Sequence, residues 1–313
     1  MGAVLTLLTG EEAFAALSAA AEEAEESRSQ YWQEQVERFS VSADGMQVGP
    51  STIGNTSTKT SLFRDTAHYL LQRPLVRFGR AFPDTRDCER LGRRLARLQD
   101  RQFTYDMLRQ SLTLALIRNY LDLDTPGECN LVIGDGFGVM SALLLMHRPE
   151  RRTILANLTK PLLLDLHYIR RALPEIGIAL ATDTDDVAEA LADERISLIA
   201  VRADDAPIIS EAAIGLAVNV VSMQEMDLPV VERYFRVLRG NKAARTALYC
   251  CNKLFKVSNF EDYPWHKYDR ILHDSLCPWS QWYYSARPPF WHRRRYGEKE
   301  IWHRLALLEM DNA

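Results

Sequence analysis

A glycine-rich turn is the feature of this sequence with the clearest chemical meaning. It spans Gly134 to Gly138 and reads Gly-Asp-Gly-Phe-Gly. The short run 130–133 before it predicts a buried strand, and the apolar spacing of 139–146 after it predicts a helix. Glycines let the backbone approach a ligand closely, and a helix N-terminus offers free N–H groups. This arrangement is typical of loops that bind nucleotides.

The spacing of the glycines narrows the choice of ligand. A dinucleotide-binding loop follows G-x-G-x-x-G and would need its third glycine at position 139, where this chain has Val139. The pattern G-x-G-x-G found here resembles the first motif of class I S-adenosylmethionine-dependent methyltransferases. A purely structural turn is the alternative, because glycine-rich turns also form where only the backbone requires them.

Polar residues follow the other predicted strands, and ligands of parallel sheets bind outside the carboxyl ends of the strands. Asn157 ends the strand 153–158, about 20 residues after Asp135, where an acid that binds a ribose is expected. Asparagine can still hydrogen-bond a hydroxyl, but without charge assistance. Asp204 follows the strand 196–201 and could accept from an adenine amino group, although aspartate is also common in turns.

Two residues could act as the general base that a hydroxyl acceptor needs. Glu225 lies just past the strand 214–221, on the side where a ligand is expected, although it could instead cap or pair with a neighbouring helix. His303 stands beside Arg304 and could stay neutral at pH 7, although it could also be a structural histidine. His167 lies within a predicted helix, and we expect it to be structural.

The C-terminal part, 260–313, is rich in aromatic residues. Aromatic faces suit the apolar faces of sugar rings, and Trp265, Trp279 and Tyr283 are candidates for such contacts. For most of these residues, packing in a lid or core is the alternative. The basic run 292–295 could hold the phosphate of a nucleotide-linked or lipid-linked sugar, or it could be a solvated face.

A metal site is the weaker hypothesis. Asp204 and Asp205 supply two carboxylates, and His266, His273 and Cys277 lie close together in the sequence. These residues form no tight ligand pattern. We therefore predict that no metal is required.

Composition limits the class of protein. The chain has 313 residues, of which 47% are hydrophobic and 26% charged, enough for one large domain or two ordinary ones. A net charge of −4 argues against nucleic acid or a membrane surface as partner. No apolar run reaches the ~18 residues of a membrane span. The five cysteines form no C-x-x-C pair and no secretion signal is evident, so we expect a cytoplasmic protein with reduced thiols.

Strands and helices alternate from residue 126 onward, which is the signature of a parallel sheet. We predict an α/β fold in which a Rossmann-like sheet with helices on both faces, over 126–313, follows a helical region over 1–125. The segment 40–62 is rich in turn formers and is either a solvated linker or a loop that folds over the active site.

Helices are predicted in the N-terminal region over 10–39, 62–71 and 87–121, with Pro74 and Pro83 as breaks. This helical region could cover the site or form a dimer contact.

Beyond the glycine loop, the chain resembles the bacterial sugar O-methyltransferases related to the nanchangmycin-type enzyme. The resemblance extends from about Tyr31 to the C-terminus, and its specific parts are the Ser-Met-Gln-Glu-Met and Cys-Pro-Trp segments. The matching segments are 132–138, 219–226, 249–253, 263–265, 276–279 and 303–304.

This resemblance implies a Rossmann-like class I methyltransferase that transfers a methyl group from S-adenosylmethionine to a sugar hydroxyl. The candidate catalytic residues are Glu225 and His303. The candidate cofactor-binding residues are Gly134, Asp135, Gly136, Phe137, Gly138, Asn157, Leu158, Ala203, Asp204, Asn219, Ser222 and Met223. The candidate substrate-binding residues are Asn252, Trp265, Trp279, Tyr283 and Arg304.

Two positions depart from the wider methyltransferase pattern: Val132 replaces the usual acid two places before the first glycine, and Asn157 replaces the ribose-binding acid. Three other functions stay open. The acceptor could be a nitrogen or a non-sugar hydroxyl, or the protein could bind the methyl donor without catalysis. A nucleotide-sugar oxidoreductase is disfavoured by Val139.

Overall fold

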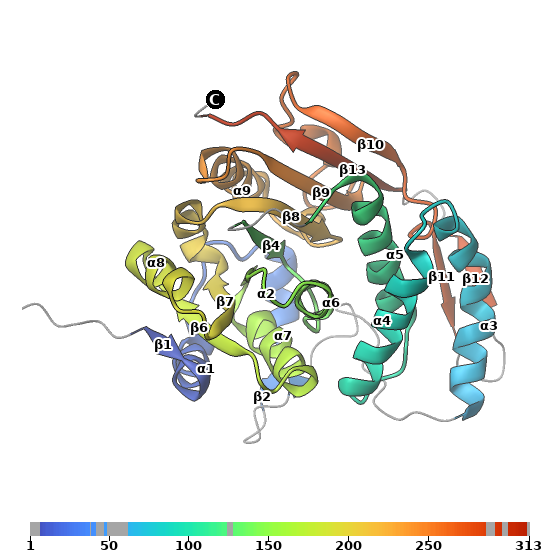
Figure 1. The fold of residues 1–313 in the computed structure, drawn as a ribbon, viewed down its shortest axis with the longest axis horizontal. Helices are drawn as coiled ribbons and strands as arrows, with labels where there is room; N and C mark the ends of the chain where they lie inside the picture. The colour runs from blue at the N-terminus through green and yellow to red at the C-terminus, as the bar shows by residue number, and fades with distance from the viewer. Residues whose placement is uncertain are drawn as a thin grey trace, which may run out of the picture.

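A nine-stranded sheet forms the centre of the molecule in the computed structural model (Figure 1). The structure describes residues 7–37, 39–41, 47–48, 62–123, 128–285, 292–295 and 300–311. In spatial order, the strands are β1 (Leu8–Thr9), β6 (Gly177–Ala181), β7 (Ile196–Arg202), β5 (Thr153–Asn157), β4 (Cys129–Ile133), β8 (Ile214–Val220), β9 (Thr246–Lys253), β13 (Ile301–Leu308) and β10 (Arg270–Leu276).

The strands from β6 to β9 run parallel to one another. At the two edges the pairing changes, because β1 is antiparallel to β6, β13 to β9, and β10 to β13. Two further pairs stand apart from this sheet. They are β2 (Ser40–Val41) with β3 (Gln47–Val48), and β11 (Trp282–Ser285) with β12 (His292–Arg295).

Helices cover both faces of the sheet (Figure 1). One face carries α1 (Gly10–Ala19), α6 (Val139–His147) and α7 (Thr159–Ala172), together with the N-terminal helices α4 (Thr85–Leu98) and α5 (Tyr105–Tyr120). The other face carries α8 (Thr184–Ala192), α9 (Leu228–Gly240) and the 3-10 helix η3 (Ala203–Glu211). The remaining helices are α2 (Gln30–Val36), α3 (Leu62–Gly79), η1 (Ala20–Glu22), η4 (Met223–Glu225) and η5 (Phe260–Asp262).

Side chains along the central strands point alternately to the two faces of the sheet, which explains why a layer of helices packs on each face. Every residue of β4 is buried. Leu131 and Ile133 pack toward α9, whereas Val132 packs into the opposite core with α6 and α7. A strand buried on both faces needs apolar residues throughout, which is why the run before the glycines could be recognised in the sequence.

The predicted fold class is confirmed: a Rossmann-like α/β sheet with helices on both faces follows a helical N-terminal region. The division into 1–125 and 126–313 stays a prediction. Several contacts cross that boundary: β1 joins the sheet beside β6, α1 packs against α7, and α4 and α5 pack against α6. The loop predicted over 40–62 lies mostly outside the described residues.

Three predicted helix boundaries in the N-terminal region are wrong. Pro74 lies inside α3, which continues to Gly79 while the neighbouring Leu75 is buried. Packing against α5 therefore outweighs the lost backbone hydrogen bond at the proline. The residues from 10 to 39 form α1, η1 and α2 rather than one helix, with an extended stretch between η1 and α2.

The stretch 87–121 is also two helices, because α4 stops at Leu98. Asp100 adopts a left-handed φ of +52°. The N–H groups of Asp100 and Arg101 donate to the carbonyls of Arg97 and Ala96, at 3.1 and 2.8 Å. This is a Schellman termination, which glycine usually marks. The sequence shows no recognisable helix stop signal here, because an aspartate stands where a glycine is usual.

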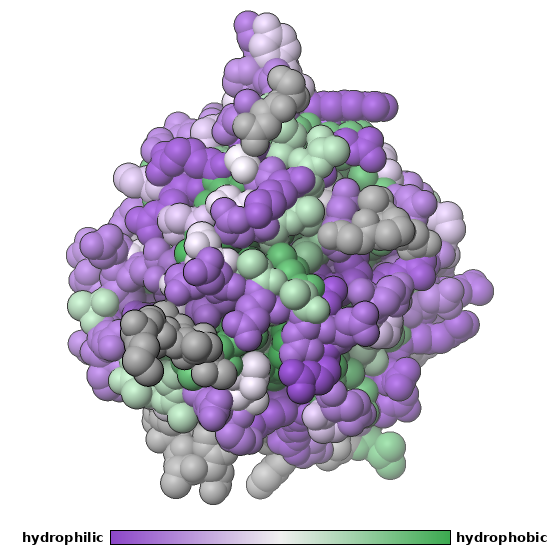
Figure 2. Space-filling model, turned by 60° about the vertical axis from the view of Figure 1, so that its left-hand side comes forward, coloured by the Kyte–Doolittle hydropathy of each residue, from purple (hydrophilic) through white to green (hydrophobic). Residues whose placement is uncertain are grey.

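The face that carries α1 and α8 is dominated by hydrophilic residues, with only a narrow and broken band of hydrophobic ones (Figure 2). Apolar side chains of these helices, such as Leu17 and Val187, are buried beneath them. Within the described ranges, no helix has both the length and the apolar character needed to cross a membrane.

A candidate active site at the carboxyl ends of the strands

A cavity opens where strands β4 and β8 end. From β4 the chain continues to β5 on one side, and it later returns to β8 on the other, so the strand order reverses between β4 and β8. Ligands of open α/β sheets bind at such a switch point. The described residues lining this glycine-loop cavity are Trp32, Arg109, Gly134, Asp135, Gly136, Asn157, Pro161, Val220, Val221, Ser222 and Glu225.

The glycine loop owes its shape to left-handed backbone angles. The φ values of Gly134, Gly136 and Gly138 are +65°, +72° and +60°, and that of Phe137 is +61°. A Cβ at position 134 would stand 1.9 Å from Ser222 Oγ, so only glycine fits there. The turn thus brings bare backbone to the cavity, as its glycine spacing predicted.

Two buried carboxyl groups hold this loop in place. Asp135 accepts hydrogen bonds from the N–H groups of Met140 and Ser141, at 2.8 and 2.7 Å, and so ties the turn to the start of α6. Asp165 of α7 accepts from Gly138 N at 3.0 Å and from Asn157 Nδ2 at 2.8 Å. Both carboxyl groups are therefore committed to backbone and amide donors.

Burial sets the titration of this pair. It raises the pKa of Asp135 to about 6, against the opposing effect of the backbone donors. It also raises the pKa of Asp165 well above its ordinary value, and repulsion from Asp135 adds to that rise. Burial and mutual repulsion both disfavour two charged carboxylates at this place, so the state in which the pair holds one proton is favoured.

Val221, directly after β8, is strained. Its φ of +64° is a left-handed value that a β-branched residue rarely adopts. The N–H of Val221 donates to the carbonyl of Cys251 at 2.7 Å, so the sheet holds it in this conformation. Strain of this kind persists where the surroundings enforce it, and it clusters at ligand sites.

Glu225 lies at the mouth of the same cavity. Lys256 donates to its carboxylate, and the ammonium of Lys256 lies 3.8 Å from the ring centroid of Tyr31. Burial raises the pKa of Glu225, and the charge of Lys256 opposes that rise. A carboxylate whose pKa is raised in this way is a stronger proton acceptor than an ordinary glutamate.

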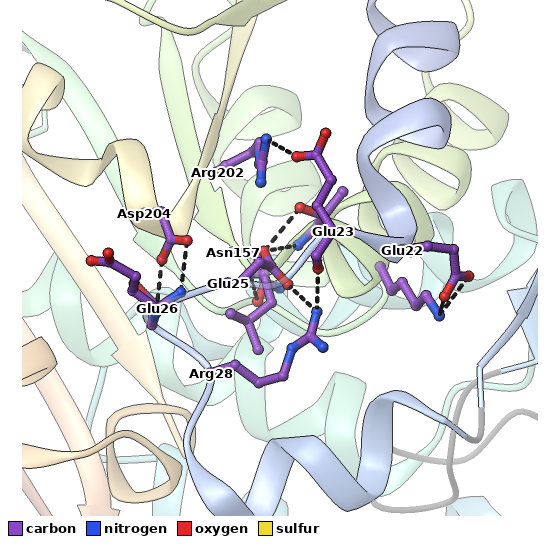
Figure 3. Close-up of polar contacts among 12 residues, drawn as sticks. Glu22, Glu23, Glu25, Glu26, Arg28, Asn157, Arg202 and Asp204 are labelled. Atoms are coloured by element: carbon purple, nitrogen blue, oxygen red, sulfur yellow. Dashed lines mark hydrogen bonds and ion pairs between the residues drawn. The ribbon is translucent and has the colours of Figure 1, made fainter.

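The neighbouring half of the sheet edge is covered by residues 20–29, which we call the strap (Figure 3). The side chain of Glu25 is only 1% exposed, and it accepts from the N–H and hydroxyl of Thr159 at 2.8 and 2.9 Å. Asp204, after β7, accepts from the N–H groups of Glu26 and Ser27 at 2.9 and 2.7 Å. Although partial burial alone would raise the pKa of Asp204, these hydrogen bonds lower it.

Ion pairs extend the contact of the strap with the sheet edge. Glu23 of the strap points toward Arg202 (Figure 3), and the two side chains pair at 3.0 Å. Glu22 pairs with Lys160 at 2.8 Å. At the far end, Ser29 Oγ donates to the carbonyl of Glu225 at 2.5 Å. The strap therefore reaches from the end of β7 to the edge of the glycine-loop cavity.

The cavity left open is small, about 90 Å³. Sites for small molecules usually enclose roughly 300–1,000 Å³. The predicted ribose position, Asn157, lines the cavity, but its amide is bonded to Asp165 and to the N–H of Leu158. The predicted adenine position, Asp204, faces the strap. The arrangement thus has room for only part of a nucleoside-sized ligand.

The remaining predicted cofactor residues have buried side chains. They are Phe137, Leu158, Ala203, Asn219 and Met223.

Asn219 and Asn252 form a buried pair that shapes the loop after β8. Asn219 Nδ2 donates to the carbonyl of Ile133, and its Oδ1 accepts from Met223 N and Asn252 Nδ2, at 2.8, 3.2 and 2.8 Å. Asn252 Oδ1 accepts from Gln224 N at 3.0 Å. Asn252 is fully buried, so the structure does not support direct substrate contact by its side chain.

Two of the aromatic candidates, Trp265 and Trp279, do not line the cavity. Trp279 is 1% exposed and packs edge-on against Phe82, in the core. Trp265 lies on the other face of the sheet, the one that carries α9. There the guanidinium of Arg304 stacks on it, 4.8 Å from the ring centroid. Aromatic residues supply apolar area wherever a core needs it, so composition alone could not separate these roles. The side chains of Tyr283 and of the run 292–295 lie outside the described part.

His303 belongs to a buried network rather than to the cavity lining. Its Nδ1 lies 3.0 Å from the hydroxyl of Tyr249, and its Nε2 lies 2.9 Å from Nε2 of His273 and 3.0 Å from Oγ of Ser275. Burial, with some help from His273, lowers its pKa to about 3. It is neutral at pH 7, as predicted, but burial and not Arg304 is the main cause.

No group of three or more His, Cys, Asp or Glu residues gathers at a common point within the residues described. The need for a metal stays a prediction about activity. The five cysteines are all buried and free, in line with reduced thiols.

Two Tyr-x-x-x-Lys spacings occur in the sequence. Tyr263 and Lys267 form one, and Tyr263 is buried in the core on the α9 face of the sheet. Tyr249 and Lys253 form the other. Both lie on strand β9, and the fully buried hydroxyl of Tyr249 is bonded to His303 away from the cavity. Neither pair therefore gives support to an oxidoreductase.

Sequence reasoning missed several residues of the site. Arg109 and Asp165 had a recognisable signal, because each is the one charged residue within an apolar helical run, 107–117 and 162–166. Trp32 and Glu25 had none. They reach the site only because the chain before α3 folds across the sheet edge.

Comparison with known proteins gives a limited result. No protein family and no curated protein matches the sequence. Solved structures match in part: the methyltransferase CalO6 at 11% identity and a TM-score of 0.36, over 61% of this chain and 60% of that one, and the pyocyanin biosynthetic protein PhzM at 13% and 0.36, over 64% and 57%. The chain thus spans under two thirds of either.

A proposed O-methyltransferase from Nostoc punctiforme PCC 73102 matches over 93% of this chain and 94% of its own, at 12% identity and a TM-score of 0.38. Values this low carry no argument about function. The functional conclusion has to rest on the residues of this chain.

Proposed function

We propose that this protein is an S-adenosylmethionine-dependent O-methyltransferase. One observation carries the proposal: a glycine loop with left-handed backbone angles opens into a cavity at the switch point of a parallel sheet. Gly134, Gly136 and Ser222 would lie against the methyl donor, which fits a position where no Cβ is tolerated.

When bound, S-adenosylmethionine supplies an electrophilic methyl carbon on a positively charged sulfur. The residues of the chain would then position an acceptor hydroxyl and remove its proton. Glu225 is the proposed general base, because it lines the cavity and burial raises its pKa toward the working range. The carboxylate of Glu225 would accept the proton that leaves the hydroxyl. Before that transfer, the ammonium of Lys256 balances the negative charge of the carboxylate.

We propose a sugar hydroxyl as acceptor, in the tailoring of a polysaccharide or a glycoside natural product. The motif resemblance supports this choice. The cavity offers one aromatic face, Trp32, and one guanidinium, Arg109, beside Glu225. An aromatic face with polar neighbours suits a sugar ring, and also suits other hydroxylated small molecules.

The strap must be displaced for the whole methyl donor to bind, if its nucleoside half lies at Asn157 and Asp204. Both carboxylate oxygens of Asp204 already accept hydrogen bonds from the backbone of the strap, and Glu25 of the strap covers the start of α7. We therefore propose that cofactor binding competes with the strap.

Two measurements test the function. Calorimetry with S-adenosylmethionine and, separately, with NAD should give heat only with the methyl donor. A screen with a radiolabelled methyl group across sugars, phenols and amines should label sugars. Binding without transfer to any acceptor would identify a non-catalytic binding protein, and absence of binding would refute the proposal.

A further inference from the structure

A second and larger cavity lies on the N-terminal helices, where it shares no lining residue with the glycine-loop cavity. It encloses about 550 Å³, within the usual range for small-molecule sites. The described residues that line it are Asp65, His68, Arg90, Arg93, Arg94, Ala96, Arg97, Arg101, Gln102 and Phe103. They come from α3, from α4 and from the turn that follows α4. We call it the arginine cavity.

Positive charge is concentrated in the lining. Five arginines face one carboxylate, that of Asp65, in a protein whose net charge is −4. Arg94 and Arg97 are exposed, and within the described residues no side-chain hydrogen bond or ion pair engages the guanidinium of either. Arg90 pairs with Asp87, but both side chains are largely exposed, and such pairs contribute little. The cavity thus presents guanidinium groups that can donate hydrogen bonds to an anionic ligand.

The deepest charge is that of Arg101, which is only 3% exposed. Its guanidinium lies 3.8 Å from the ring centroid of Phe137 and 5.0 Å from that of Tyr168. Burial lowers the pKa of Arg101 to about 10, so it remains a cation at neutral pH. The guanidinium of Arg101 is already desolvated in the folded protein. Binding an anion therefore adds no further desolvation cost for this group, and so Arg101 should contribute most to the affinity for an anion.

The cavity also has an apolar wall. The ring of Phe103 contributes to it, with the guanidinium of Arg93 stacked 4.4 Å from the ring centroid. Arg93 is held there by two hydrogen bonds to Glu89, at 3.0 and 2.7 Å. A planar group can lie against this stacked pair while an anionic group reaches the remaining arginines.

We propose that the arginine cavity binds an organic phosphate, a phosphate monoester carried on an aromatic or heterocyclic group. Guanidinium forks match phosphate oxygens in pairs, and a doubly charged monoester needs more than one of them. The volume leaves room for the organic part next to Phe103. This proposal concerns binding alone and does not depend on methyl transfer.

Calorimetry on the full chain tests the site, with phenyl phosphate and inorganic phosphate as probes. Phenyl phosphate should bind with a dissociation constant at or below about 1 mM. The double variant R94A/R97A should weaken it about tenfold or more. R86A/R245A removes the same charge from exposed arginines outside the cavity, and should change the affinity less than about twofold.

Three results would overturn the proposal. They are no heat with phenyl phosphate in the wild type, equal weakening in both double variants, and inorganic phosphate binding as tightly as phenyl phosphate. The last would mean that the apolar wall contributes nothing. Arg94 and Arg97 are exposed, so both variants should fold, and matching circular dichroism spectra and melting temperatures would confirm it.

Discussion

The two halves of the carboxyl edge of the sheet differ in what covers them. Beside β4 and β8, the glycine loop and Ser222 border an open cavity. Beside β5 and β7, the strap lies on the strand ends, with Glu25 on Thr159 and Asp204 on the strap backbone. The strand ends of both halves carry polar groups suited to a ligand, but only one half is accessible.

This difference shows that a binding motif and its access are separate properties. The loop from Gly134 to Gly138 is shaped by local backbone angles and by Asp135, whose two hydrogen-bond donors lie five and six residues away. Coverage of Asp204 depends on Glu26 and Ser27, which lie far away in the sequence. The backbone conformation of the glycine loop is mainly local in origin, although Asp165 supports it from α7, whereas the coverage of the other half is a tertiary effect.

The open half should be the more sensitive to substitution. Gly134→Ala forces a Cβ onto Ser222 and a left-handed alanine, at a cost of at least about 1–2 kcal/mol. Methyl-donor affinity by calorimetry should fall about 100-fold or more. Gly240→Ala is the control, because its Cβ would meet nothing within 4 Å, and it should bind normally. Normal binding by Gly134→Ala would disprove the assignment of the loop.

Glu225→Gln should lower the methyl-transfer rate by about 100-fold and leave methyl-donor affinity unchanged, because it removes only the proton acceptor. Since burial raises the pKa of Glu225, the wild-type rate should rise with pH above the ordinary titration range of glutamate, and the variant should lose this rise. Glu261→Gln, at an exposed position of η5, is the control. A wild-type rate and pH profile in Glu225→Gln would exclude the role.

The covered half can be opened by loosening the strap. Glu25→Ala removes the acceptor for Thr159 and should tighten methyl-donor binding about tenfold if strap and cofactor compete. Glu26→Ala removes an adjacent exposed carboxylate, whose residue contacts Asp204 only through its backbone, and should have no effect. Weaker binding by Glu25→Ala would instead place Glu25 within the cofactor site and contradict competition.

A last prediction concerns the free energy of unfolding and the carboxyl groups beneath the glycine loop, rather than binding. The folded state raises the pKa of Asp135 from 3.8 to about 6, so it binds a proton more tightly than the unfolded chain does. Stability should therefore fall as pH rises from about 4 to 6, by on the order of 2 kcal/mol. Asp165→Asn removes a second buried carboxyl group whose pKa is also raised, so stability should fall less as pH rises in urea unfolding, whereas the exposed Asp185→Asn should leave the fall unchanged. An unchanged fall in Asp165→Asn would show that folding does not raise the pKa of Asp165.

Much of the fold follows from local patterns. The strands predicted over 130–133, 153–158, 196–201 and 214–221 are all present, because strands buried on both faces are written as apolar runs. Helix ends were less predictable where chemistry was unusual, as at Pro74 inside α3 and at Asp100 in a left-handed turn. The candidate site was predicted in part: Gly134, Asn157, Ser222 and Glu225 do line one cavity.

The sequence by itself determined the glycine loop and the central sheet, because both depend on backbone preference and on the burial pattern of neighbouring residues. Tertiary structure alone decided that Trp279 and Asn252 are internal, that His303 is held by Tyr249, and that the strap lies on half of the binding edge. These outcomes depend on contacts between distant segments, and no short-range pattern specifies which distant partner a polar side chain will meet.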